Sequence, residues 1–133
     1  MFHGLSTEIA YLLLAGLLLL VHLCAQAISL TRQFGSAYNA SARDQQRIAT
    51  GIAGRAERAF RNYLETFPLF AAMALAVHMT GKADWWSGFG AALYFWARLA
   101  YLPLYLAGIP YLRSAIWSLA TLGILIIMWR LAI

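Results

Sequence analysis

Three polar residues in the middle of the chain have the types and spacing of a binding site for a small charged molecule. Arg58, Asn62 and Glu65 stand at positions i, i+4 and i+7 of the stretch RAERAFRNYLETFP, so they line one face of a helix. A guanidinium binds carboxylates, a carboxylate binds an ammonium group, and an amide both donates and accepts hydrogen bonds. The expected ligand is therefore an anionic molecule that also bears an ammonium group.

A second polar set follows further along the chain. Arg98, Tyr101 and Tyr105 are again spaced for one helix face, and Arg113 stands at the start of the last apolar segment. Near the N-terminus, a polar stripe leads to the end of the first apolar segment: His22, Gln26, Ser29 and Arg32. Ionisable groups within a membrane span face the bundle interior, because lipid cannot solvate them. We expect these groups to converge at one depth.

The segments that must position these residues are long and apolar. The chain has 133 residues, of which 62% are hydrophobic and 11% charged, whereas a soluble domain is about 25% charged. Residues 9–30 carry no formal charge, and a spanning helix takes about 20 apolar residues. The stretch 66–81 is shorter, so its helix must recruit polar residues upstream. We predict one domain, residues 1–133, with four spans at about 8–30, 60–80, 85–107 and 111–131.

Short joints at residues 81–84 and 108–110 make the last three segments antiparallel neighbours. The predicted fold class is all-α, an integral membrane four-helix bundle. A soluble helical protein with an unusually large core is the alternative. A removable signal peptide is disfavoured, because Glu8 rather than a basic residue precedes the first segment.

The net charge of +5 is concentrated in one region. Residues 31–61 contain six arginines against two acids, and positively charged loops stay cytoplasmic. The segment 31–56 is therefore predicted to be a cytoplasmic loop with a helical turn near residues 42–48, and both termini are predicted on the non-cytoplasmic side. Few aromatic residues lie among the arginines, so no nucleic-acid partner is expected. Cys24 stands alone and the three histidines are scattered, so neither a disulfide nor a metal site is expected.

The motif R-A-x-x-x-N-x-x-E-x-x-P, formed here by Arg58, Ala59, Asn62, Glu65 and Pro68, resembles the signature of the MAPEG family. These are membrane-associated proteins in eicosanoid and glutathione metabolism. The stretches YFWARLAYLPLY (94–105) and YLRSAIWSLATLG (111–123) resemble two further segments of that family. The resemblance covers about residues 55–130, with a fitting first helix before it. It suggests a bacterial-type member similar to the microsomal glutathione transferases.

The resemblance implies four transmembrane helices, a homotrimer, and glutathione bound as co-substrate between subunits near the cytoplasmic face. Carried over residue by residue, Arg113 is the catalytic residue that faces the thiol. The glutathione-binding residues are expected to be Arg58, Asn62, Glu65, Arg98, Tyr101, Tyr105 and, at the end of the first helix, Arg32. Thr66 and Phe60 depart from the family pattern, because relatives have a tyrosine and a Gln or His there.

The function that follows is a membrane-bound glutathione transferase or peroxidase with a role in detoxification. It would activate the glutathione thiolate for attack on apolar electrophiles or lipid hydroperoxides. The alternative is a non-catalytic lipid-binding scaffold of the same family. A proton-driven exporter that uses Glu65 is disfavoured, because the predicted site is rich in arginine.

Each group also has a purely structural interpretation. Arg32, Arg55 and Arg61 could be simple positive-inside residues. Glu65 could pair with Arg61 or with Arg98. Tyr101 and Tyr105 could be interface tyrosines. Only their positions in space can separate these interpretations.

Overall fold

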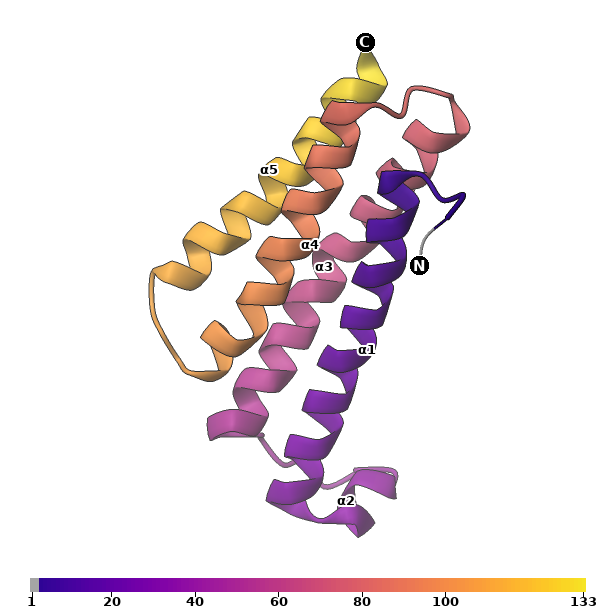
Figure 1. Ribbon diagram of the computed structural model, residues 1–133. Coiled ribbons are helices and arrows are strands. Elements are labelled where there is room, and N and C mark those ends of the chain that lie inside the picture. Colours follow the sequence, from indigo (N-terminus) through magenta and orange to yellow (C-terminus); the bar gives the residue numbers. More distant parts are fainter. Residues whose placement is uncertain (1–2) are drawn as a thin grey trace.

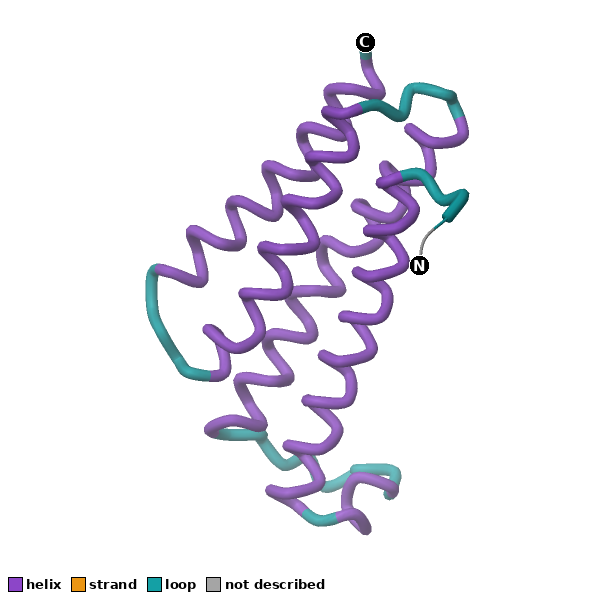
Figure 2. The backbone as a smooth tube through the Cα atoms, in the orientation of Figure 1, coloured by secondary structure: helices purple, strands orange, loops and turns teal. Residues whose placement is uncertain are grey.

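The computed structural model describes residues 3–133, and within them the chain is all-α. Four long helices run alternately up and down, with one short helix after the first (Figure 1). The helices are α1 (Thr7–Phe34), α2 (Ser36–Ala40), α3 (Gly51–Met79), α4 (Trp85–Leu106) and α5 (Leu112–Ala132). The described residues include no strand, and the connections are confined to the two ends of the bundle (Figure 2). The predicted all-α fold class and helical bundle are confirmed.

Local sequence signals explain where these helices begin and end. The Ser6 hydroxyl accepts a hydrogen bond from the Ile9 amide at the start of α1, and Gly35, with φ of 86°, ends it. Asp84 and Ser87 cap each other reciprocally at the start of α4. Residues that satisfy free backbone groups therefore delimit α1 and the start of α4, whereas α3 and α5 begin without a side-chain cap.

Two central helices hold the bundle together. Both α3 and α4 contact each of the other long helices. Between α4 and α5 the backbones meet at Gly90 and Gly123, where a Cβ on Gly123 would lie 2.6 Å from the Gly90 carbonyl oxygen. Inside, aromatic rings stack from α1 through α3 to α4, with Phe70 and Tyr94 ring centroids 4.0 Å apart. The core thus fixes the relative positions of the α3 and α4 faces that carry the predicted site.

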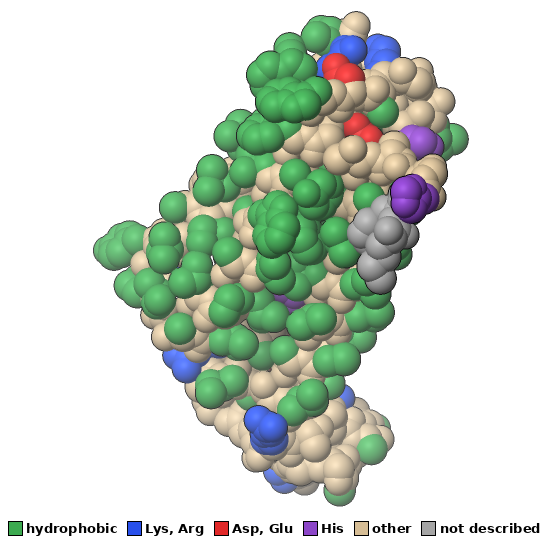
Figure 3. All heavy atoms as spheres, viewed as in Figure 1, with side chains coloured by type: hydrophobic (Ala, Val, Ile, Leu, Met, Phe, Trp, Pro, Cys, Tyr) green, Lys and Arg blue, Asp and Glu red, His purple; other side chains and the backbone are tan. Residues whose placement is uncertain are grey.

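The outer surface of the bundle is unusually apolar. Hydrophobic side chains cover the middle of the face in Figure 3, and Lys and Arg lie near its two ends. Among the described helices, α1 and α5 are long and apolar enough to cross a membrane. In the most apolar stretch of each helix, only 17% and 22% of the residues are buried within the bundle. A core helix of a soluble protein would be mostly buried, so this surface favours lipid contact.

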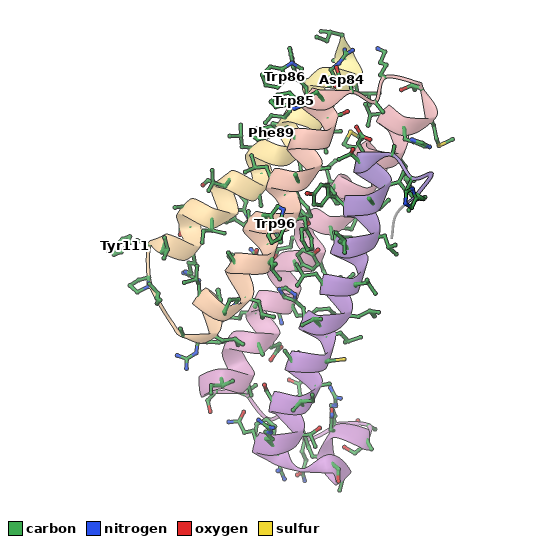
Figure 4. All side chains as sticks on the ribbon, viewed as in Figure 1. Asp84, Trp85, Trp86, Phe89, Trp96 and Tyr111 are labelled. Carbon is green, nitrogen blue, oxygen red and sulfur yellow. The ribbon has the colours of Figure 1, made fainter. Side chains whose placement is uncertain are left out.

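Aromatic side chains gather where α4 begins. Trp85 and Phe89 stack with ring centroids 5.5 Å apart, and Trp86 meets Trp129 of α5 edge to face (Figure 4). Trp96 lies further along α4, and Tyr111 lies at the α4–α5 turn. Amphipathic rings near the ends of apolar helices are typical of the membrane interface.

The segment predicted as a long loop at residues 31–56 is shorter and differently structured. Helix α1 continues to Phe34 and α3 already begins at Gly51. The predicted helical turn near residues 42–48 is wrong, because the short helix lies at Ser36–Ala40 and residues 42–48 are irregular. The prediction relied on apolar runs, and these cannot reveal a helix whose first three turns are rich in Arg, Glu and Gly.

Candidate functional site

The polar face of α3 lies beside the core rather than within it. Arg58 and Glu65 are exposed in the single chain and Asn62 is half-buried, whereas Ala59 and Tyr63 on the opposite face are fully buried. The i, i+4, i+7 spacing thus produces the single face that the sequence predicts. The three residues are available to a ligand or to a neighbouring surface.

Arg98 is the most deeply buried cation of the chain, with 0% of its surface exposed. Its guanidinium donates hydrogen bonds to Asn62 Oδ1 at 2.7 Å and to Thr66 Oγ1 at 2.6 Å. Among residues 3–133 it has no carboxylate partner. The Arg98 charge is therefore stabilised by neutral acceptors.

Three tyrosine rings complete the Arg98 environment. The Arg98 Cζ atom lies 5.3 Å from the Tyr101 ring centroid, 5.5 Å from that of Tyr63 and 5.8 Å from that of Tyr94. These distances fall within the range of cation–π attraction, which strengthens in desolvated sites. Arg98 thereby links α4 to the Asn62 side chain of α3 and fixes its orientation.

Tyr105 connects three parts of the predicted site. Arg58 Nε donates a hydrogen bond to its phenol oxygen at 3.2 Å. The Arg113 Cζ atom lies 5.2 Å from the Tyr105 ring centroid. The Tyr101 and Tyr105 ring centroids are 5.4 Å apart. Residues from α3, α4 and α5 therefore meet around one buried phenol.

A cavity of about 380 Å³ opens beside this phenol, and we call it the α3–α5 cavity. It is lined by three arginines and by residues of α4 and the α4–α5 turn: Arg55, Arg58, Arg113, Tyr105, Gly108, Ile109 and Pro110. No acidic side chain is among these residues. Three cations around one concave surface create a strongly positive potential that suits an anion.

Arg55 is a lining residue that the sequence did not single out. Its Nε atom is buried and has no hydrogen-bond partner among residues 3–133. Gly108, with φ of 74°, lets the Arg55 guanidinium approach, because a Cβ at Gly108 would lie 2.9 Å from Arg55 Nη1. In sequence Arg55 resembles any basic residue of a positive loop, and only folding brings the α4–α5 turn against it.

Thr66 is the second residue whose role was not foreseen. Besides accepting from Arg98, its hydroxyl lies 3.1 Å from the Tyr94 phenol oxygen. Thr66 therefore supplies one of the two hydrogen-bond acceptors of the buried Arg98 guanidinium.

Of the eight predicted site residues, three line the α3–α5 cavity: Arg58, Tyr105 and Arg113. Asn62, Arg98 and Tyr101 are linked to Tyr105 through the contacts above, and the remaining two stand apart. Arg32 is exposed near the end of α1 and borders a separate depression with Gln33 and Thr50. Glu65 is exposed and makes no ion pair within the described residues. The interpretation that Glu65 pairs with Arg61 is wrong, because Arg61 donates to Glu57 at 3.1 Å instead.

The chemistry available at the α3–α5 cavity is recognition of carboxylates combined with stabilisation of a nearby anion. Arginine forks match carboxylates through paired, charge-assisted hydrogen bonds. Arg113 is the second residue of α5, so the partial positive charge of that helix N-terminus adds to its own. A thiol held there would ionise more readily than in water.

The comparison with known families gives one match. The MAPEG family model matches residues 9–133, nearly the whole chain. No curated protein matches the chain. Together with the two candidate membrane-spanning helices, the match identifies a membrane protein, and the chain belongs to the MAPEG family.

Proposed function

We propose that the chain is a membrane-bound, glutathione-dependent enzyme, and that the α3–α5 cavity holds the thiol end of glutathione. The observation that carries the proposal is the convergence of Arg55, Arg58 and Arg113 on one cavity beside the Tyr105 phenol. Glutathione offers two carboxylates, one ammonium group and a thiol. Three arginines without a lining acid suit a ligand with that surplus of negative charge.

Arg113 is assigned the activation of the thiol. An ordinary thiol has a pKa of about 8.5. A contacting guanidinium favours the thiolate, and a shift of about 1.5 units would ionise about half of the thiol at pH 7. The exposed Arg113 side chain borders the cavity, so a second substrate can reach the sulfur.

The remaining residues bind and orient the tripeptide. Arg58, with Arg55 beside it, suits the carboxylates, and Glu65 suits the ammonium group. Asn62 can donate and accept, and Tyr101 and Tyr105 supply phenols at the same level. Arg98 acts through Asn62, because it is fully buried and its bond to that amide fixes which edge faces the ligand.

A homotrimer would complete the site. Glu65 and Arg58 are exposed in the single chain and Arg32 lies away from the cavity. A neighbouring copy packed against α3 would bury this polar face and could bring its own Arg32 to the ligand. The proposed assembly has four membrane spans per chain, with the 41–50 loop on the cytoplasmic side and both termini opposite.

The second substrate is proposed to be an apolar electrophile or a lipid hydroperoxide. The apolar outer surface of the bundle would let such a molecule approach from the lipid. The thiolate would attack an aryl halide, forming a carbon–sulfur bond and releasing halide. With a hydroperoxide it would attack the distal oxygen, which breaks the O–O bond, releases the alcohol and leaves glutathione sulfenic acid. A second glutathione would then reduce the sulfenic acid to the disulfide with loss of water. Detoxification is the role that such chemistry serves.

Conjugation of glutathione to an aryl halide by the purified protein in detergent tests the proposal. Wild type should turn over, and Arg113→Ala should be at least about tenfold slower at neutral pH, because less of the thiol is ionised. Lys82→Ala removes a cation from the opposite end of the bundle and should retain wild-type activity. Equal rates for wild type and Arg113→Ala would refute the assignment. Lipid binding without any turnover would favour the non-catalytic scaffold.

A further inference from the structure

A second concave site lies between the 36–49 segment and the adjoining ends of α1 and α3. Its volume is about 540 Å³, which exceeds that of the α3–α5 cavity, and we call it the loop cavity. Four arginines and one glutamate line it: Arg43, Arg47, Arg58, Arg61 and Glu57. The function proposed above uses only Arg58 of these residues.

The irregular wall of the loop cavity is held by specific contacts. Arg47 donates its backbone amide to the Tyr38 phenol oxygen at 3.0 Å, and its guanidinium lies 4.9 Å from the Tyr38 ring centroid. At the end of the loop, Gln33 and Thr50 exchange two hydrogen bonds of 2.6 and 3.1 Å. These contacts fix the loop against α1 and α2, and the loop arginines line the same cavity as Arg58 and Arg61 of α3.

The arginines of the loop cavity exceed the acids that could neutralise them. Glu57 is already paired with Arg61, and Arg43 donates to the backbone carbonyl of Asn39 at 2.9 Å. Within residues 3–133, the guanidinium of Arg47 has aromatic neighbours but no carboxylate partner. Several forked donors around one hollow match the oxygens of a phosphate group, which can accept from more than one guanidinium.

We propose that the loop cavity binds a phosphate-bearing anion, and that this phosphate belongs to the headgroup of an anionic membrane lipid. The choice of a lipid rests on the apolar residues around the arginines. Ile48 lines the cavity while 85% exposed, and Leu30 of α1, a helix long enough to span a membrane, forms part of the wall. A soluble phosphate compound would gain nothing from the exposed Ile48 side chain, whereas an acyl chain would cover it. Leu30 is already buried and shows only that the cavity reaches α1.

Binding of short-chain lipids to the full chain in detergent tests the inference. The probes are dihexanoyl phosphatidic acid, dihexanoyl phosphatidylcholine and inorganic phosphate, with native mass spectrometry and calorimetry as readouts. Arg58 is left intact because it also lines the α3–α5 cavity. The test variant is the double substitution Arg43→Gln with Arg47→Gln, and both side chains are exposed. Arg32→Gln removes one exposed cation outside the loop cavity and is the single-charge control.

Phosphatidic acid should bind wild type more tightly than either other probe. The double variant should bind it at least about tenfold more weakly, since each lost charge-assisted hydrogen bond is worth about a factor of ten. Arg32→Gln should change binding by less than about threefold, because Arg32 is exposed and does not line the loop cavity. Equal weakening by Arg32→Gln, or no binding to wild type, would overturn the proposal. If inorganic phosphate bound as tightly as phosphatidic acid, the claim that the phosphate belongs to a lipid headgroup would be wrong. None of these outcomes depends on glutathione turnover.

Discussion

Helices α4 and α5 form a hairpin with two ends (Figure 1). The charged side chains at these two ends are partnered in opposite ways. Where α4 begins and α5 ends, Arg130 donates to Asp84 at 2.5 Å and Lys82 donates to the Leu131 carbonyl at 2.8 Å. At the other end, Arg113 borders the α3–α5 cavity without a carboxylate partner among the described residues. The first arrangement locks the helices together, and the second leaves positive charge available for a ligand.

Arg98 combines features of both ends, because it is partnered but only by neutral groups. A buried cation needs partners, because the loss of hydration is expensive. Arg98 is stabilised by an amide, a hydroxyl and three rings. Arg130 is thus paired with an acid far from the proposed site, whereas Arg98 is supported by neutral groups beside it. An acid in place of these neutral groups would compete with an anionic ligand for the cations of the site.

The largest expected effect concerns the close backbone contact between α4 and α5 at Gly90 and Gly123. Gly123→Ala places a methyl group 2.6 Å from the Gly90 carbonyl oxygen, and the backbones must separate. We expect a loss of about 3 kcal/mol in the free energy of unfolding, the upper part of the range for overpacking. Thermal unfolding in detergent measures it. Gly16→Ala in α1 is the matched control, because a Cβ there meets nothing within 4 Å. Equal stability of the two variants would contradict the close contact.

The next effect concerns the support of Arg98 by neutral groups. Thr66→Val keeps the shape of the side chain but removes the acceptor of the 2.6 Å bond from Arg98. The expected loss is about 2 kcal/mol, typical of a hydrogen bond to a charged group. Thr66→Ser retains the hydroxyl and should be markedly more stable than Thr66→Val. If the two variants unfold at the same temperature, the Thr66 hydroxyl does not stabilise Arg98.

The smallest effect concerns the ion pair between Arg130 and Asp84, at the end where α4 begins and α5 ends. The Arg130 hydrogen bond holds the pKa of Asp84 below its ordinary value. A lowered pKa means that the pair stabilises the fold above about pH 4 and that this contribution is lost as the pH falls further. Asp84→Asn keeps the helix cap but removes the charge, so its unfolding temperature should vary less with pH in this window. A wild type and variant with parallel pH profiles would show that the pair contributes nothing.

Sequence patterns predicted the helices best where apolar runs coincide with them. The segment predicted at 85–107 is α4 (Trp85–Leu106), and that predicted at 111–131 is α5 (Leu112–Ala132). The start of α3 was predicted nine residues late, because its first turns are polar and exposed on one side. Helical spacing predicted the polar face of α3, which depends only on local geometry.

The candidate site was predictable only in part. The family resemblance pointed to Arg58, Tyr105 and Arg113, and the structure brings these three to one cavity. It did not point to Arg55, whose role depends on the approach of Gly108 from another helix. It did not reveal that Thr66 supports Arg98 either, because a threonine in an apolar helix usually bonds its own backbone. Sequence patterns report local geometry, so they did not predict these contacts between residues distant in sequence.

The most direct test of the proposed role of Arg113 at the α3–α5 cavity is to measure the ionisation of bound glutathione. Thiolate ultraviolet absorbance, recorded against pH for glutathione with wild type and with Arg113→Ala, reports the thiol pKa without any second substrate. Wild type should show a pKa at least about one unit below that of free glutathione, and Arg113→Ala should return it towards the free value. A bound thiol that titrates like free glutathione in wild type would contradict the account.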